Sequence, residues 1–187
     1  QTQKNITSPF IPSYTIGMLT RETILLEFSS TIMALILAGK VGSSITSEIG
    51  TMRVTEQIDA LEIMGINSAN FLVLPKITAF VSFIPILVTM SMATSILGGY
   101  LISVITGIVS PEIFIYGIQT MFVEWYVWYA LIKSLFFAFV ISSVASYFGY
   151  HVTGGALQVG KASTNAVVTS SILILLLDVI LTNLMLQ

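Results

Sequence analysis

Charged side chains occur deep inside long apolar stretches of this 187-residue sequence. Glu27 lies in the first such stretch, Lys133 in the third and Asp178 in the last. Charged groups in hydrocarbon are costly, and they usually face a cavity, a partner or one another. We therefore expect Glu27 to face a cavity or to belong to a structural ion pair with the nearby Arg21. Lys133 and Asp178 are expected to neutralise one another between helices.

Few other residue types in the chain are suited to catalysis or metal binding. It has no cysteine and one histidine, His151, which argues against thiolate metal sites and against a Ser-His-Asp set. The stretch 155–161, GALQVGK, fits the first seven positions of a phosphate-binding P-loop, but Ala162 stands where the Mg²⁺-binding Ser or Thr is required. We therefore expect no catalytic residue, no metal site and no bound cofactor in this chain.

The elements that carry these charges are long enough to cross a bilayer. The chain is 55% hydrophobic and 9% charged, whereas soluble domains have about 25% charged residues. No charge occurs from residue 77 to residue 111, and a spanning helix needs roughly 20 apolar residues. We predict an all-α polytopic membrane protein, one domain over 1–187, without a basic tract for nucleic acid. The predicted spans are about 16–47, 71–109, 126–150 and 162–185, with a short surface helix over 112–122.

Charge concentrates between the first two spans, in the segment 48–67. A helix there would place Val54, Ile58 and Leu61 on one side and charged residues largely on another. This pattern predicts an amphipathic helix outside the bilayer, over about 51–64. Its two signs of charge favour docking to a protein over binding to anionic lipid, although an ordinary surface helix fits the same pattern. The candidate docking residues are Arg53, Glu56, Gln57, Asp59 and Glu62.

The placement of basic residues predicts the orientation, because cytoplasmic loops carry the excess of Lys and Arg. Arg53 and Lys76 lie in or beside the first long loop, and Lys161 lies beside the last one. Both loops are therefore expected on the cytoplasmic side, with the two chain ends outside. Residues 1–12 do not have the pattern of a signal peptide. A chain that starts outside without one is expected to lack a preceding span.

The loop sequence also resembles that of a known family. The stretches AGKVGS at 38–43, EIGTMRVTEQIDALEIMG at 48–65 and LPK at 74–76 are similar to those of the MlaE-type permeases. These are membrane subunits of ABC transporters that move phospholipids between bacterial membranes. The similarity continues through 97–99 and 132–134 to LDVILT at 177–182, and so covers essentially the whole chain.

The resemblance implies a non-catalytic permease subunit that forms a homodimer in the inner membrane of a Gram-negative bacterium. A separate cytoplasmic ATPase would bind ATP and Mg²⁺, an MCE-domain protein would cap the outer side, and a further span would precede the matched region. In the family, the helix at 51–64 couples to the ATPase. The family's cavity glutamate falls on Glu27, although Leu26 and Phe28 replace the arginine and leucine that usually flank it. The lipid-cavity residues implied are Glu27, Phe28, Thr31 and Leu35.

Two other functions remain as alternatives. A gradient-driven secondary transporter or channel would use Glu27, Lys133 and Asp178 as an ion path, and it would work without an ATPase. A membrane scaffold would only anchor an outer lipid-binding ring and would transfer no lipid. The motif at 48–65 disfavours both alternatives.

Overall fold

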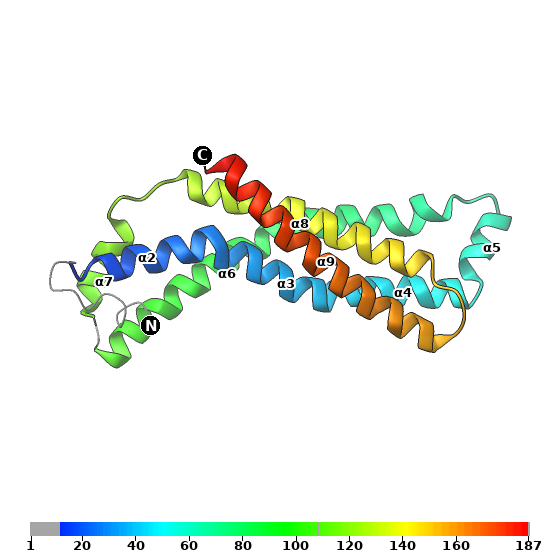
Figure 1. Cartoon of the computed structure of the whole chain (residues 1–187), viewed down its shortest axis with the longest axis horizontal. Coiled ribbons are helices and arrows are strands. Elements are labelled where there is room, and N and C mark those ends of the chain that lie inside the picture. The colour runs from blue at the N-terminus through cyan, green and yellow to red at the C-terminus, as the bar shows by residue number, and fades with distance from the viewer. Residues whose placement is uncertain (1–11, 108, 187) are drawn as a thin grey trace. The chain divides into compact units, whose positions relative to one another are not determined.

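The computed structural model describes residues 12–107 and 109–186, which are helical over most of their length (Figure 1). The first helical stretch is α2 (Thr15–Thr23), the π-helical η1 (Ile24–Ile32), α3 (Met33–Leu37), the π-helical η2 (Ala38–Gly42) and α4 (Ser43–Val54). After α5 (Gln57–Ile63), the π-helical η3 (Ala69–Val73) leads into α6 (Leu74–Thr106). The remaining helices are α7 (Pro111–Gln119), α8 (Trp125–Tyr150) and α9 (Ala156–Met185).

Four helical stretches are long and apolar enough to cross a membrane: Thr15–Val54, Ala69–Thr106, Trp125–Tyr150 and Ala156–Met185. The prediction of an all-α polytopic membrane protein is therefore confirmed. The first stretch extends beyond residue 47, and the last begins before residue 162. Short polar residues occur at these ends, and they are accommodated within the helix, where the Thr51 hydroxyl donates to the Ser47 carbonyl at 2.7 Å.

The chain divides into two compact units, one of residues 1–30 and 86–132 and the other of residues 31–85 and 133–187. In the first unit, α7 packs against α2 through two glycines. A Cβ atom on Gly17 would lie 2.6 Å from the Phe114 carbonyl oxygen, and one on Gly117 would collide with the Tyr14 carbonyl. The backbones can approach this closely only because both residues lack a side chain.

Helix α7 replaces the surface helix expected over 112–122. It begins with Pro111 at its first position, and the Ser110 hydroxyl accepts a hydrogen bond from the Ile113 amide at 3.4 Å. It ends earlier than expected because the backbone becomes extended at Thr120.

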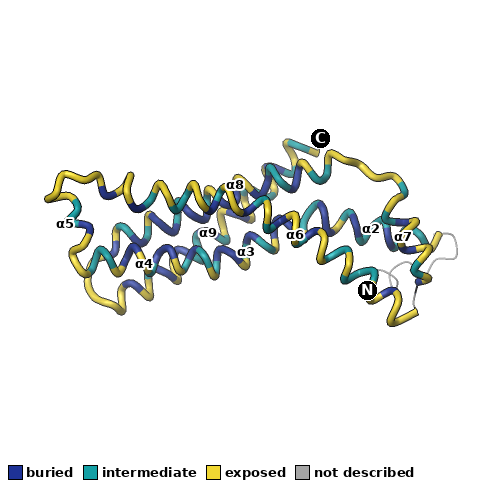
Figure 2. The backbone as a smooth tube through the Cα atoms, turned by 180° about the vertical axis from the view of Figure 1, so that it is seen from behind, coloured by how far each residue is buried: buried dark blue, intermediate teal, exposed yellow. Residues whose placement is uncertain are grey.

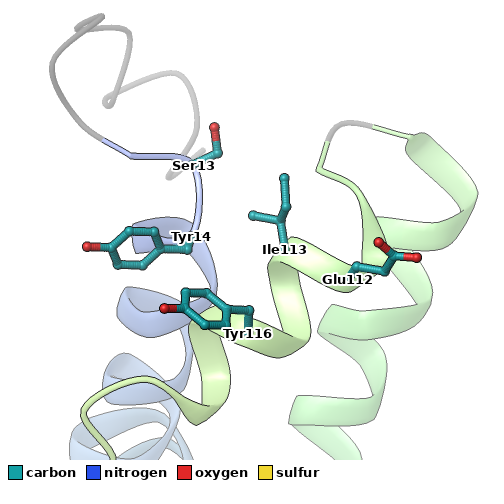
Figure 3. Close-up of a pocket in the computed structure, with 5 residues that line it drawn as sticks. All are labelled: Ser13, Tyr14, Glu112, Ile113 and Tyr116. Carbon is teal, nitrogen blue, oxygen red and sulfur yellow. The ribbon is translucent and has the colours of Figure 1, made fainter.

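A shallow pocket lies beside α2 and α7. Tyr14 and Tyr116 line it and meet edge to face with ring centres 5.7 Å apart, and Glu112 also lines it (Figure 3).

Arg21 fixes the end of α7. Its guanidinium is buried and donates hydrogen bonds to the carbonyls of Ile118 at 2.7 Å, Thr120 at 2.8 Å and Met121 at 3.1 Å. A helix C-terminus leaves its last carbonyls without partners, so a cation there satisfies them and complements the helix dipole. The carboxylate beside Arg21 is that of Glu22, at 3.4 Å.

The second unit packs α4 against α8, α9 and the segment that follows α5. Its core comprises Ile45, Ile49, Ile58, Leu72 and Ala145. Helices α4 and α8 cross closely at Gly149, where an added Cβ would lie 2.9 Å from the Thr46 carbonyl oxygen. The Thr46 hydroxyl in turn donates to the Ala145 carbonyl at 2.9 Å. At one end of this unit, α5 and the turn after it are largely exposed (Figure 2).

Candidate functional site

The charged segment between the first two spans forms a corner, which we call the α4–α5 corner (residues 51–64). Helix α4 ends at Val54, Glu56 has a left-handed backbone with φ of 60°, and α5 begins at Gln57. The structure therefore divides the single helix expected over 51–64 into two. The period of apolar residues did not reveal this break. A glutamate with a left-handed backbone is uncommon, and Ile58 would be expected to be buried whether or not the helix broke before it.

An ion pair closes the corner. Arg53 and Asp59 meet at 2.6 Å, and the Arg53 guanidinium also lies 5.8 Å from the centre of the Tyr150 ring. Both charged side chains are partly exposed, so the pair contributes about 1 kcal/mol or less to stability. Its main effect is geometric, because it fixes the direction in which α5 leaves α4.

A second set of polar contacts ties α5 to the end of α8. The Glu62 carboxylate accepts hydrogen bonds from the Tyr150 hydroxyl at 2.9 Å and from the Ser68 hydroxyl at 2.9 Å. These bonds hold the pKa of the Glu62 carboxyl below its usual range. Sequence reasoning selected Glu62 but missed Ser68 and Tyr150. No local signal points to Tyr150, which lies 88 positions away along the chain.

The lowered pKa predicts how the α4–α5 corner responds to acid. Because the folded-state pKa lies below the ordinary value, the bonds to Glu62 are present above about pH 4.5 and are lost as pH falls through the folded-state pKa. A nitroxide on Ile63→Cys, in a chain without native cysteine, should be restrained at pH 6 and should become mobile as the pH is lowered through the folded-state pKa of Glu62. In a Tyr150→Phe background the change should shrink. Identical pH curves in the two backgrounds would contradict this prediction.

The outward face of the corner combines charge with apolar surface. Glu56, Gln57 and Ala60 are exposed, and beside them Ile63 and Met64 are 87% and 65% exposed. These residues lie outside the four spanning stretches. Exposed apolar side chains rimmed by charged residues are typical of a protein contact. Sequence reasoning chose the polar residues and passed over Ile63 and Met64, which the helical period places off the buried side.

The corner is also linked to the next span. The Lys76 ammonium near the start of α6 lies 2.7 Å from the Glu48 carboxylate of α4. This pair joins α4 to α6, whereas the bonds of Glu62 join α5 to Tyr150 at the end of α8 and to Ser68. A displacement of α5 would therefore be passed to several helices.

The expected lipid-cavity residues lie along the first helical stretch. Glu27 and Phe28 belong to η1 in the first unit, with Phe28 exposed and Glu27 partly so. Leu35 is partly buried in α3 of the second unit. Thr31 is buried, and its hydroxyl donates to the Asp178 carboxylate at 2.9 Å. Thr31 is thus joined to the charged pair of the second unit.

That pair consists of Lys133 on α8 and Asp178 on α9, which the structure brings together. The Lys133 ammonium lies 2.5 Å from the Asp178 carboxylate, and the two side chains are 0% and 17% exposed. The ammonium also lies 6.0 Å from the centre of the Phe137 ring. Both residues lie within spanning helices, so each provides the compensating charge that the other needs in an apolar setting.

The structure shows where His151 and the stretch that resembles a P-loop lie. The His151 Nδ1 atom lies 2.9 Å from the Tyr147 carbonyl, just after the end of α8. Residues 155–161 form the first turns of α9, which begin after Gly155.

Comparison with known proteins finds a family model and several relatives that are all described as permeases. A family model described as Permease MlaE matches residues 1–184. A probable ABC transporter permease protein from Synechocystis sp. is 38% identical over 173 residues, which is 92% of this chain and 66% of the relative. A protein of the same description from Rickettsia bellii is 39% identical over 84% of this chain and 61% of its own length. One from Pyropia yezoensis is 34% identical over 86% of this chain. The chain thus spans less than two thirds of the length of the first two of these relatives.

Proposed function

The chain belongs to the MlaE permease family, and we propose that it is the membrane-spanning subunit of an ABC transporter that moves phospholipids between membranes. ATP and Mg²⁺ are bound by a separate cytoplasmic ATPase, so this subunit is not itself an enzyme. It works as a homodimer with an MCE-domain protein on the outer side, in the inner membrane of a Gram-negative bacterium.

The observation that supports this proposal most is the α4–α5 corner. If ATP hydrolysis by a partner outside the membrane changes the conformation of this subunit, the subunit needs an element that binds the partner and that also contacts the spanning helices. Arg53, Glu56, Gln57, Asp59 and Glu62 lie in this corner, and Ile63 adds an exposed apolar side chain. The bond that the Tyr150 hydroxyl donates to Glu62 connects α5 to α8, and the Lys76–Glu48 pair connects α4, which leads into the corner, to α6. ATP binding and hydrolysis would favour different positions of the corner, and hence different states of the spans.

Lipid would contact the first helical stretch. We assign Glu27, Phe28, Thr31 and Leu35 to this contact, with the Glu27 carboxylate meeting the polar part of the lipid and Phe28 meeting an acyl chain. The closed Lys133–Asp178 pair supports a structural use of these two charges, because each already neutralises the other. Lipid movement would then depend on the partner ATPase and not on an ion gradient.

A lipid-transfer assay tests the role of Glu27. The full-length permease, reconstituted with its ATPase and outer partner, should lose at least about tenfold of its transfer rate in Glu27→Ala, because a charged contact in a water-poor cavity is worth more than 1 kcal/mol. Glu112→Ala, which changes an exposed carboxylate on α7, is the matched control and should keep the wild-type rate. Normal transfer by Glu27→Ala in an assembled complex would refute the assignment.

A further inference from the structure

Two grooves of the second unit meet at the end of α8. The first, of about 370 Å³, lies between Ala69, Val73 and Ile77 on one side and Ser146 on the other. The second, of about 340 Å³, lies between the end of α8 and the start of α9. Tyr147 and His151 line both grooves. The two grooves therefore share one wall, in which the two ring centres lie 4.4 Å apart with their planes tilted by 36°.

The grooves differ in chemistry. The first has an apolar wall from η3 and α6, whereas the second is lined by the ammonium of Lys161 and by the amides of Gln158 and Asn165. None of the residues lining either groove is acidic. An apolar channel beside a polar pocket that carries a positive charge matches a ligand with one apolar chain and one anionic group.

His151 contributes a donor or acceptor to the second groove. A carbonyl oxygen can only accept, so His151 Nδ1 donates to the Tyr147 carbonyl at 2.9 Å. This leaves Nε2 as the ring nitrogen for a ligand. The Lys161 ammonium, which lines the same groove, would favour an anion.

The position of the grooves decides the class of ligand. Helix α8 ends at Tyr150, α9 begins at Ala156 and α6 begins at Leu74, so the grooves lie where three spanning helices reach the edge of the apolar region. Tyrosine side chains are enriched at this level, where lipid headgroups meet water. The same end of the unit carries α5 (Figure 1).

We propose that the two grooves together bind one anionic glycerophospholipid, with its phosphate beside Lys161 and His151 and one acyl chain along Ala69, Val73 and Ile77. The site uses none of the residues assigned to lipid transport or to docking of the ATPase. It therefore holds whether or not the proposed transport function is correct. The bound lipid would brace α6, α8 and α9 at the end of the bundle that carries the α4–α5 corner.

Native mass spectrometry of the full-length protein, titrated with phosphatidylglycerol or phosphatidylcholine, tests this proposal. Lys161→Gln should weaken phosphatidylglycerol binding about fivefold and change phosphatidylcholine binding less. Ala69→Trp, at an exposed position on the groove wall, should block the acyl chain and weaken both lipids. Lys40→Gln, an exposed lysine outside both grooves, is the matched control and should bind as wild type.

Equal melting temperatures without added lipid would show that the variants are folded. Wild-type binding by both Lys161→Gln and Ala69→Trp would overturn the proposal. So would displacement of the lipid by millimolar inorganic phosphate alone, because the polar groove would then be a free-phosphate site. Loss of ATPase binding in Lys161→Gln without any change in lipid binding would assign the second groove to a protein partner and would also overturn it.

Discussion

Replacing Lys133 by methionine is expected to destabilise the folded protein by about 3–5 kcal/mol. The change removes the charge that lies 2.5 Å from Asp178 and leaves a carboxylate in an apolar setting, where the Thr31 hydroxyl still donates a hydrogen bond to it. The free energy of unfolding, measured by titration with a denaturing detergent in mixed micelles, should show the loss. Lys76→Met is the matched control. It breaks a pair whose side chains are 23% and 57% exposed and should cost about 1 kcal/mol or less.

A double substitution separates the pair from the packing around it. Lys133→Met with Asp178→Leu removes both charges, and buried pairs replaced in this way are often neutral or more stable. Most of the lost stability should therefore return. If the double variant were as unstable as Lys133→Met alone, the loss would come from packing around Lys133 and the electrostatic explanation would be wrong.

Replacing Arg21 by methionine should release the end of α7 and cost about 3–5 kcal/mol. Three carbonyls, those of Ile118, Thr120 and Met121, would lose hydrogen bonds from a buried guanidinium. A hydrogen bond to a charged group contributes about 1.5–3 kcal/mol net, and the three contributions do not add in full because they share one donor group. Hydrogen exchange should show faster exchange in α7, while the amides of α4 stay protected. The measured stability should fall in the same detergent titration.

Glu22→Gln distinguishes the two roles of Arg21. It removes the ion pair at 3.4 Å but keeps the bonds to the α7 carbonyls. Its expected cost is about 1 kcal/mol or less, with α7 still protected from exchange. Rapid exchange of α7 in Glu22→Gln, or full protection in Arg21→Met, would contradict the assignment of Arg21 as the residue that fixes α7.

Hydropathy was sufficient to predict the four spans, because each apolar stretch exceeds the length that a bilayer requires. The intramembrane charges were also informative, since Lys133 and Asp178 have few ways to avoid an isolated charge except by meeting. Both inferences depend on the low polarity of the bilayer interior, which acts on every residue of a spanning segment. They do not require knowledge of which helices are neighbours.

The features that sequence reasoning missed depend on contacts between distant segments. The break at Glu56 is held by the Arg53–Asp59 pair and by burial of Ile58 in a core that α8 completes. The partner of Glu62 comes from the end of α8, and Ser146 of α8 lines a groove whose other wall is η3 and α6. A helical period describes one element at a time, so none of these could be read from the local pattern.

The exposed tip of the α4–α5 corner is a second feature that the local sequence pattern could not predict. Ile63 and Met64 are apolar and were not selected as docking residues, yet they are among the most exposed large apolar side chains outside the spans. Their exposure follows from where α5 ends relative to the core and not from their residue type. Any partner that covers this corner would bury them.

Docking of the ATPase on the α4–α5 corner is the central claim, and co-purification of the full-length permease with its ATPase from membranes in mild detergent tests it most directly. Ile63→Glu places a charge at the exposed tip of α5, and Val123→Glu makes the same change at an exposed position in the connection between α7 and α8. We predict that the ATPase is lost from Ile63→Glu and retained by Val123→Glu, with both permeases recovered in normal amount. Full recovery of the ATPase with a folded Ile63→Glu permease would contradict the claim.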